Sequence, residues 1–391
     1  MRLSPEEQFI SSVLSLGLKT QDPHGEERRW PRDGINWDGF VPLVAHHGLG
    51  PLLFHRTRNL NLEKTLPDDV SKGLEDLHRS STGIWGTHRQ ILRRILRRFC
   101  ETGLEVVLLK GAQLAHSDYP EPCLRPIEDI DLLVRRSNRA KVMRLMLEMG
   151  FNPYETNQTC DKFFIRRIPK HPKKALPKPI FVEVHSNLQT PIRLNRSFDI
   201  DIDELWKGAR ERVMFGFPFL ELCPTHNLIY LCAHLGHHHF SRLIWAYDIA
   251  LLVHRHRTAI EWKTLEYICG SVRIKNSLYY GLSLCQEFFG VPIPDSVLRG
   301  LSPSWGRGRM GQFLIRRHLR GLEKSRVSRF NQCLIKAILI DSWREAIRWF
   351  LFPTREWMKQ EYSPGNTHRI YRYYLLHPLL YLIKTMRTPV R

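Results

Sequence analysis

The eight cysteines of this 391-residue sequence include no Cys-x-x-Cys pair. Disulfide frameworks and thiolate zinc sites are usually built from closely spaced cysteines, so the spacing disfavours both and favours a reducing environment. No stretch approaches the roughly 18 uninterrupted apolar residues of a membrane-spanning helix. The N-terminal MRLSPEEQFISS has acidic residues where a secretion signal has a positive stretch followed by an apolar run. We therefore expect a cytoplasmic protein.

Two catalytic motifs that contain histidine are also missing. The sequence has neither a His-Glu-x-x-His motif nor a His-Asp dipeptide, which excludes the zincin and HD-hydrolase templates. His234 and the histidines at 237–239 precede Asp248, but their spacing fits neither template. Asp248 lies on an otherwise apolar helix face. Because an unpaired buried charge is very costly, we expect it to pair with Arg242 or a nearby histidine.

Acidic residues are scarce relative to basic ones, since 39 Asp and Glu against 59 Lys and Arg give a net charge of +20. Residues 301–391 contain 18 basic and 5 acidic residues, or +13, which leaves +7 for the first 300. This excess predicts an anionic partner or substrate, such as a nucleotide, a nucleic acid or an anionic membrane surface. Two interpretations of the basic C-terminal region stay open: it recruits a polyanion, or it packs as a structural cover.

The apolar pattern divides the chain into four regions. Residues 1–100 have apolar residues at helical spacing, residues 101–222 mix strand and helix patterns, residues 223–301 return to helical spacing, and residues 302–391 form the basic helical region. The polar stretch SPSWGRGRMGQ (302–312) is the best candidate for a linker. These patterns predict an α+β protein, with a small mixed-sheet core embedded between N-terminal and C-terminal helical regions.

Four segments of the central region have strand patterns. LEVVLLKG (104–111) is a continuous apolar run, typical of a strand buried on both faces, and DIDLLV (129–134) alternates acidic and apolar residues. FFIRRI (163–168) and IFVEV (180–184) predict two strands joined by an exposed, Lys- and Pro-rich hairpin loop.

The acidic residues of two of these strands suggest a metal site. Asp129 and Asp131 are separated by one residue, so the period-2 geometry of a strand places both carboxylates on one face, roughly 6–7 Å apart. Like charges on a buried face are tolerated mainly when a cation lies between them. Glu183 has the same character on a second strand. Three such carboxylates can hold two magnesium ions about 3.5–4 Å apart. The structural alternative is a half-solvated strand without metal.

Neighbouring residues add chemistry suited to phosphate. Lys110 and Gly111 end the preceding strand: the glycine lets backbone N–H groups approach phosphate oxygens, and the ammonium adds a counter-charge. Arg125 precedes the acidic pair by four residues. His185 shares the strand face of the third carboxylate, where it can bond to substrate or support a carboxylate; a core histidine is the alternative. Neither the Walker pattern nor the dinucleotide-binding pattern surrounds Lys110 and Gly111.

At these residues the sequence resembles a known family. LLKGAQLAHSDYPEPCLRPIEDIDLLV and, about fifty residues later, FVEVHSNL closely resemble the bacterial uncharacterised nucleotidyltransferase family of the polymerase-beta-like nucleotidyltransferase superfamily. The flanking segments WDGFVPLVAHHGLGPLLFHRT and AHLGHHHFSRLIWAYDIALLV are similar to helices of that family. The resemblance implies that Gly111 is the turn glycine of the family, that Asp129 and Asp131 bind metal, and that Glu183 is the third carboxylate.

Motifs and resemblance together predict a metal-dependent enzyme with a nucleotidyltransferase core. It would transfer a nucleoside monophosphate from a nucleoside triphosphate such as ATP to a hydroxyl of a sugar, protein or nucleic acid, with release of pyrophosphate. The expected catalytic residues, which also bind two magnesium ions, are Asp129, Asp131 and Glu183. The expected nucleotide-binding residues are Lys110, Gly111, Arg125 and His185. Ala112 stands where many family members have Ser or Gly, which favours the alternative of a catalytically silent nucleotide-binding or scaffold protein.

Overall fold

The computed structural model describes residues 3–18, 34–156, 160–165, 179–188, 201–323 and 329–353, together with residues 358, 374, 376–378, 380 and 381. Its α-helices are α1 (Pro5–Ser15), α2 (Trp37–His46), α3 (Gly50–Asn59), α4 (Asp68–Glu101), α5 (Lys110–Ser117), α6 (Arg139–Glu148), α7 (Ile202–Lys207), α8 (Pro224–His237), α9 (Leu243–His256), α10 (Trp262–Ser271), α11 (Lys275–Phe289), α12 (Asp295–Leu301), α13 (Trp305–Glu323), α14 (Arg329–Leu339) and α15 (Trp343–Leu351). Its strands are β1 (Val107–Leu109), β2 (Asp129–Leu133), β3 (Asn152–Thr156), β4 (Cys160–Ile165), β5 (Ile180–His185), β6 (Arg210–Met214) and β7 (Phe217–Glu221).

The strands form one mixed sheet in the order β3-β4-β5-β2-β1-β7-β6. β2 lies at its centre, antiparallel to β1 and parallel to β5. Antiparallel pairs β3–β4, β4–β5 and β6–β7 complete the two sides, and β1 pairs in parallel with β7. Because β2 has neighbours on both sides, each of its residues faces one of two covered surfaces, and the alternation in DIDLLV decides which.

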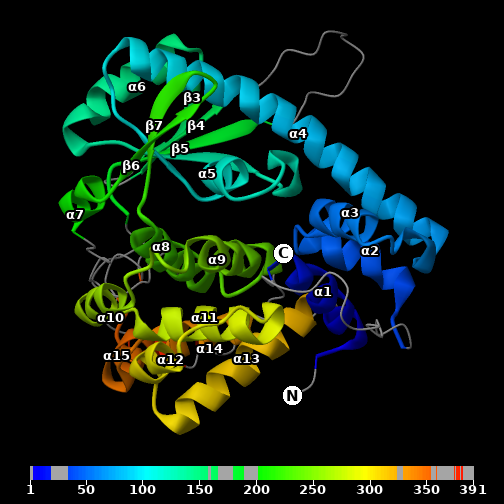
Figure 1. Cartoon of the computed structure of the whole chain (residues 1–391). Coiled ribbons are helices and arrows are strands. Elements are labelled where there is room, and N and C mark those ends of the chain that lie inside the picture. The colour runs from blue at the N-terminus through cyan, green and yellow to red at the C-terminus, as the bar shows by residue number, and fades with distance from the viewer. Residues whose placement is uncertain are drawn as a thin grey trace.

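The two faces of the sheet pack into different hydrophobic clusters. Leu132 of β2 packs with α4 and α6, whereas Leu133 packs in a larger cluster that contains α1–α3 and α8–α11. α4 contributes to both, since its N-terminal Val70 lies in the larger cluster and its C-terminal Phe99 in the sheet cluster. Figure 1 shows this long helix running from the sheet to α2 and α3. Asp131, in step with Leu133, therefore faces the helical side.

The predicted α+β class is confirmed, because a small mixed sheet lies between helices from both ends of the chain. The first five residues of DIDLLV form β2, and the predicted hairpin exists as the antiparallel pair β4–β5, although β4 begins three residues earlier than FFIRRI. The loop predicted between them lies outside the described residues. β6 and β7 extend the sheet through a two-residue turn, Phe215-Gly216, whose positive φ angles of 57° and 84° fit a tight hairpin.

The predicted linker at 302–312 is wrong, because most of it is the beginning of α13. The guanidinium of Arg307 is buried and donates to the main-chain carbonyl of Asp341 at 2.9 Å, while the Tyr280 hydroxyl donates to the carbonyl of Arg307 at 2.9 Å. A Cβ at Gly311 would collide with the Tyr280 ring. Gly311 therefore serves close helix packing rather than chain flexibility.

The described helices of the basic region pack against the rest of the protein. Ile315 and Leu319 of α13 and Ile338 of α14 are buried in the larger hydrophobic cluster. This packing favours the structural interpretation for the described part of the region, while the regional boundaries stay predictions. Among the residues described, no helix combines the length and apolar character needed to cross a membrane.

Candidate active site

The turn from β1 into α5 carries a strained lysine. The strand ends at Leu109 and the helix begins at Lys110, whose φ of +48° is a left-handed conformation that side-chain-bearing residues adopt at a cost. Its ammonium Nζ lies 2.6 Å from Oδ1 of Asp131 and 6.0 Å from the centre of the Tyr230 ring. Backbone strain that brings a buried cation to a carboxylate is typical of a functional site, since glycine would make the same turn at lower cost.

The three predicted carboxylates come together. Asp129 and Asp131 lie on one face of β2, and the parallel register with β5 places Glu183 beside Asp131. Ligand oxygens of the three residues lie within 4.8 Å of one another. Their number, chemistry and spacing fit a divalent cation with oxygen ligands, as predicted.

Burial and neighbouring charges give the three carboxyl groups different proton affinities. Burial and the charge of Asp131 raise the pKa of Asp129 to about 7. Burial also opposes ionisation of Asp131, but the Lys110 ammonium and a hydrogen bond from His185 outweigh it and hold the pKa of Asp131 well below its ordinary value. Burial raises the pKa of Glu183 as well, yet hydrogen bonds, first among them one from His185, bring it down to about 2. Asp129 is thus the carboxyl group whose charge the metal-free site supports least.

His185 supports the carboxylates from the end of β5. Its Nε2 lies 3.0 Å from Oδ1 of Asp131 and 3.5 Å from Oε2 of Glu183. These contacts raise its pKa well above the ordinary value, although its burial opposes the charge. The predicted contact between His185 and a carboxylate is therefore present, and its role toward nucleotide stays a prediction.

Sequence reasoning missed two residues beside the carboxylates, Lys162 and Cys160. Nζ of Lys162 lies 2.9 Å from Oε1 of Glu183, and Cys160 makes a side-chain hydrogen bond with His185. The antiparallel register sets Lys162 opposite Glu183 and Cys160 opposite His185. Period-2 alternation shows which β4 residues share a face, but only the pairing register shows what they meet.

Gly111 is explained by its protein neighbours. A Cβ at this position would lie 2.6 Å from Nη1 of Arg125 and 2.7 Å from Cγ2 of Ile127. The space we assigned to an approaching phosphate on this side of the glycine is filled by a guanidinium and an isoleucine methyl group. The glycine thus permits a close internal contact, and phosphate binding by the N–H groups of the turn stays a prediction.

Arg125 forms a buried ion pair with Asp248 of α9. Its Nη2 lies 2.8 Å from Oδ2 and its Nε 3.4 Å from Oδ1 of Asp248, which also accepts a 2.7 Å hydrogen bond from the Tyr119 hydroxyl. Asp248 is buried as predicted, but its partners are Arg125 and Tyr119 rather than the predicted Arg242 or a nearby histidine, and Arg242 pairs with Glu128. The pair joins the sheet region to the following helices, and a nucleotide-binding role for Arg125 stays a prediction.

The histidine cluster is an aromatic group next to the site. His234 and His238 pack on Trp245 with ring centroids 5.2 Å and 4.8 Å apart. Burial lowers the pKa of His234 well below its ordinary value and that of His238 to about 4, and the charge of Lys110 contributes to both shifts. Neither group of clustered metal-ligand side chains in the described part of the chain includes these rings.

The side chain of Ala112 faces away from the carboxylates. It is 1% exposed and packs in the sheet cluster with residues such as Leu108 and Leu132, on the opposite face of β2 from Asp131. A hydroxyl group at this position would be buried among apolar side chains. Alanine here is therefore explained by packing and gives little support to a catalytically silent protein.

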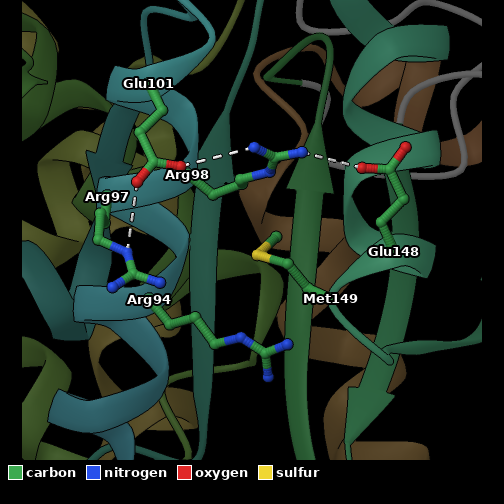
Figure 2. Close-up of a pocket in the computed structure, with 6 residues that line it drawn as sticks. All are labelled: Arg94, Arg97, Arg98, Glu101, Glu148 and Met149. Atoms are coloured by element: carbon green, nitrogen blue, oxygen red, sulfur yellow. Dashed lines mark hydrogen bonds and ion pairs between the residues drawn. The ribbon is translucent and has the colours of Figure 1, made fainter.

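A surface pocket of about 320 Å³ lies between α4 and α6, away from the carboxylates. Figure 2 shows Arg98 between Glu101 of its own helix and Glu148 of α6, at N–O distances of 3.5 Å and 3.2 Å. Met149, which also lines the pocket, packs in the sheet cluster on the other side of the sheet from Asp131. The arginines here are largely paired on the surface, and the pocket is separate from the candidate active site.

A central strand with two clustered carboxylates, a third on its parallel neighbour and a lysine-bearing strand-to-helix turn are the features that the resemblance predicted for a nucleotidyltransferase. The model of the family described as "Uncharacterised nucleotidyltransferase" matches residues 33–290, more than half of the chain, and the protein belongs to this family. The matched range includes every candidate site residue and ends before α12. Bacterial origin and superfamily placement stay predictions.

A solved structure, that of an antigenic nucleotidyltransferase-like protein from Paracoccidioides brasiliensis, is similar over 54% of this chain and 95% of its own, with 14% sequence identity and a TM-score of 0.34. No curated protein matches the sequence.

Proposed function

We propose that the protein is a magnesium-dependent nucleotidyltransferase that moves a nucleoside monophosphate from a nucleoside triphosphate to a hydroxyl acceptor and releases pyrophosphate. The observation that carries the proposal is the cluster formed by Asp129, Asp131 and Glu183, whose oxygens lie within 4.8 Å of one another. When bound there, two magnesium ions would activate the attacking hydroxyl and neutralise the leaving phosphate.

The protein's own cations prepare the carboxylates for this task. Lys110 holds Asp131 from one side and His185 from another, which fixes the orientation of the carboxylate on β2. A cation bound by Asp131 would compete with the Lys110 ammonium and free it to pair with a phosphate. We therefore expect the Lys110 ammonium to pair with the triphosphate when it binds, while His185 keeps Asp131 in place.

The acceptor is a sugar, a protein or a nucleic acid, and the reaction takes place in the cytoplasm. The net charge of +13 over residues 301–391 favours an anionic acceptor or one held at an anionic membrane surface. Labelling with each of the four nucleoside triphosphates carrying a labelled α-phosphate would identify the class, since the label follows the acceptor.

The test uses the full-length protein in calorimetry with each ribonucleoside triphosphate, with and without magnesium, followed by measurement of pyrophosphate release. Asp129→Asn and Glu183→Gln should abolish magnesium-dependent binding and turnover. Glu128→Gln is the matched control, because Glu128 precedes Asp129 but its side chain is 72% exposed and pairs with Arg242. Normal binding and turnover in both site variants would refute the assignment. Magnesium-dependent binding without transfer to any acceptor would indicate the catalytically silent alternative.

A further inference from the structure

A second group of metal-ligand side chains lies beside the three carboxylates. Cys160 of β4 and His185 of β5 are direct cross-strand partners, and Glu183 is two residues before His185 on the same strand face. One ligand atom from each, sulfur, ring nitrogen or carboxylate oxygen, lies within 4.8 Å of the other two. Cys160 is 7% exposed, so the group sits inside the sheet region rather than on the surface.

The chemistry of this group differs from that of the carboxylates. A thiolate, an imidazole and a carboxylate are the ligands that zinc prefers, whereas magnesium takes oxygen ligands alone. With Nδ1 of His185 as the metal ligand, its Nε2 would keep the 3.0 Å contact with Oδ1 of Asp131, the kind of support that metal-bound histidines almost always have on their second ring nitrogen. In the described residues, these three side chains and the carboxylate cluster are the two groups that meet the ligand spacing.

We propose that Cys160, Glu183 and His185 form a zinc site that overlaps the magnesium site through Glu183. Three protein ligands leave the fourth tetrahedral position for water. The sequence disfavoured a thiolate zinc site because it has no Cys-x-x-Cys pair, and Cys160 and His185 are 25 residues apart in it. The β4–β5 pairing removes that objection, since it makes them cross-strand neighbours.

The shared glutamate gives the site a regulatory consequence, which rests on the proposed function. Oε1 of Glu183 is held by Lys162 at 2.9 Å and its Oε2 is 3.5 Å from His185. Zinc on the Cys160 side would draw the Glu183 carboxylate toward β4 and away from Asp131. The magnesium site would then lose its third ligand, so zinc should inhibit nucleotidyl transfer.

The direct test uses cobalt(II) as a spectroscopic substitute for zinc in the full-length, reduced, metal-free protein. Bound at Cys160, cobalt should show an intense thiolate-to-metal charge-transfer band that added zinc removes by displacement. Cys160→Ser should abolish the band, and His185→Gln should weaken zinc binding at least tenfold, the lower end of the loss expected for a missing ligand or its support. Cys100→Ser, at an exposed cysteine outside the group, is the control and should leave the band unchanged.

The results separate this proposal from the proposed function. No charge-transfer band in the wild-type protein, or a band that persists in Cys160→Ser, would overturn the zinc site whatever the enzyme does. A zinc-displaceable band that depends on Cys160, in a protein that turns over no nucleotide, would support the site and count against the proposed function. If the protein is active, zinc inhibition should be relieved in Cys160→Ser and retained in Cys100→Ser. Equal inhibition of both variants would overturn the overlap.

Discussion

Asp129 and Asp131 lie in one strand, but replacing each of them by asparagine should change the stability of the protein in opposite directions. In the metal-free protein, asparagine at 129 removes a charge that burial and Asp131 disfavour, whereas asparagine at 131 removes the partner of a buried lysine. From the sequence alone, relief of like-charge repulsion predicts that either substitution leaves stability unchanged or raised. The Lys110–Asp131 contact of 2.6 Å reverses that expectation for Asp131.

The magnitudes follow from the geometry. Raising the pKa of Asp129 from 3.8 to about 7 sets a ceiling of roughly 4 kcal/mol on the stability gained by Asp129→Asn above neutral pH, at about 1.4 kcal/mol per pH unit. Since Asp129 is coupled to Asp131, we expect about 2–4 kcal/mol. Asp131→Asn leaves the Lys110 ammonium, with a side chain only 14% exposed, without its carboxylate. Removing one partner of a buried pair costs about 3–5 kcal/mol.

The pH dependence of the stability difference between Asp129→Asn and the wild type shows whether the charge of Asp129 causes it. Between the unfolded pKa of an aspartate, about 4, and the folded pKa of Asp129, about 7, the folded protein binds more protons at this group than the unfolded chain. Protonated Asp129 therefore stabilises the folded protein relative to its charged form at low pH, and this stabilisation is lost as the pH rises through about 7. The advantage of Asp129→Asn over the wild type should grow by about 2 kcal/mol from about pH 5.5 to pH 7 and then level off.

Urea unfolding of chelator-treated protein, followed by tryptophan fluorescence and circular dichroism, measures these differences. Asp69→Asn is the control, because Asp69 is exposed at the start of α4 and should give a small difference that does not vary over this pH range. Shifts of the same sign in Asp129→Asn and Asp131→Asn, or an Asp129→Asn advantage that is independent of pH, would refute the electrostatic reasoning.

Three further predictions concern packing around the site. Gly111→Ala should lower the thermal stability of the protein, because its Cβ would lie 2.6 Å from Nη1 of the buried Arg125; an unchanged melting temperature would contradict the close packing of this turn. Asp248→Ala should cost about 3–5 kcal/mol in urea unfolding, and adding Arg125→Met should recover part of that loss in a double-mutant cycle. Truncation after residue 310 removes buried apolar side chains of α13 and α14, so the shortened protein should be insoluble; a soluble, folded product would contradict the structural interpretation of the region.

The site carboxylates could be predicted from the sequence because strand geometry is strict. In a strand with two covered faces, residues two apart share a face, and a slip of one residue would bury the wrong set. Asp129 and Asp131 therefore had to lie together, and the alternation around Glu183 gave it a matching face. The mixed fold followed from the same patterns, because continuous and alternating apolar runs are confined to one part of the chain.

The partners of these residues could not be predicted, because they depend on register and packing. Lys162 meets Glu183 through the β4–β5 register, which the strand patterns do not fix. Arg125 meets Asp248 of α9 across 123 residues of sequence, a contact that arises only in the folded chain. The apolar pattern indicated that Asp248 is buried, but it left the choice among arginines to the tertiary fold.

Asp129 distinguishes a functional role of the carboxylate cluster from a purely structural one. Lys110 pairs with Asp131 and Lys162 pairs with Glu183, so those two carboxylates are stable without metal. In the described part of the protein no ion pair reaches Asp129, and its raised pKa shows that keeping it charged weakens the fold. Folding alone would favour a neutral residue here, and a costly residue with no structural gain is expected where function requires it. A bound divalent cation would supply the charge that Asp129 lacks.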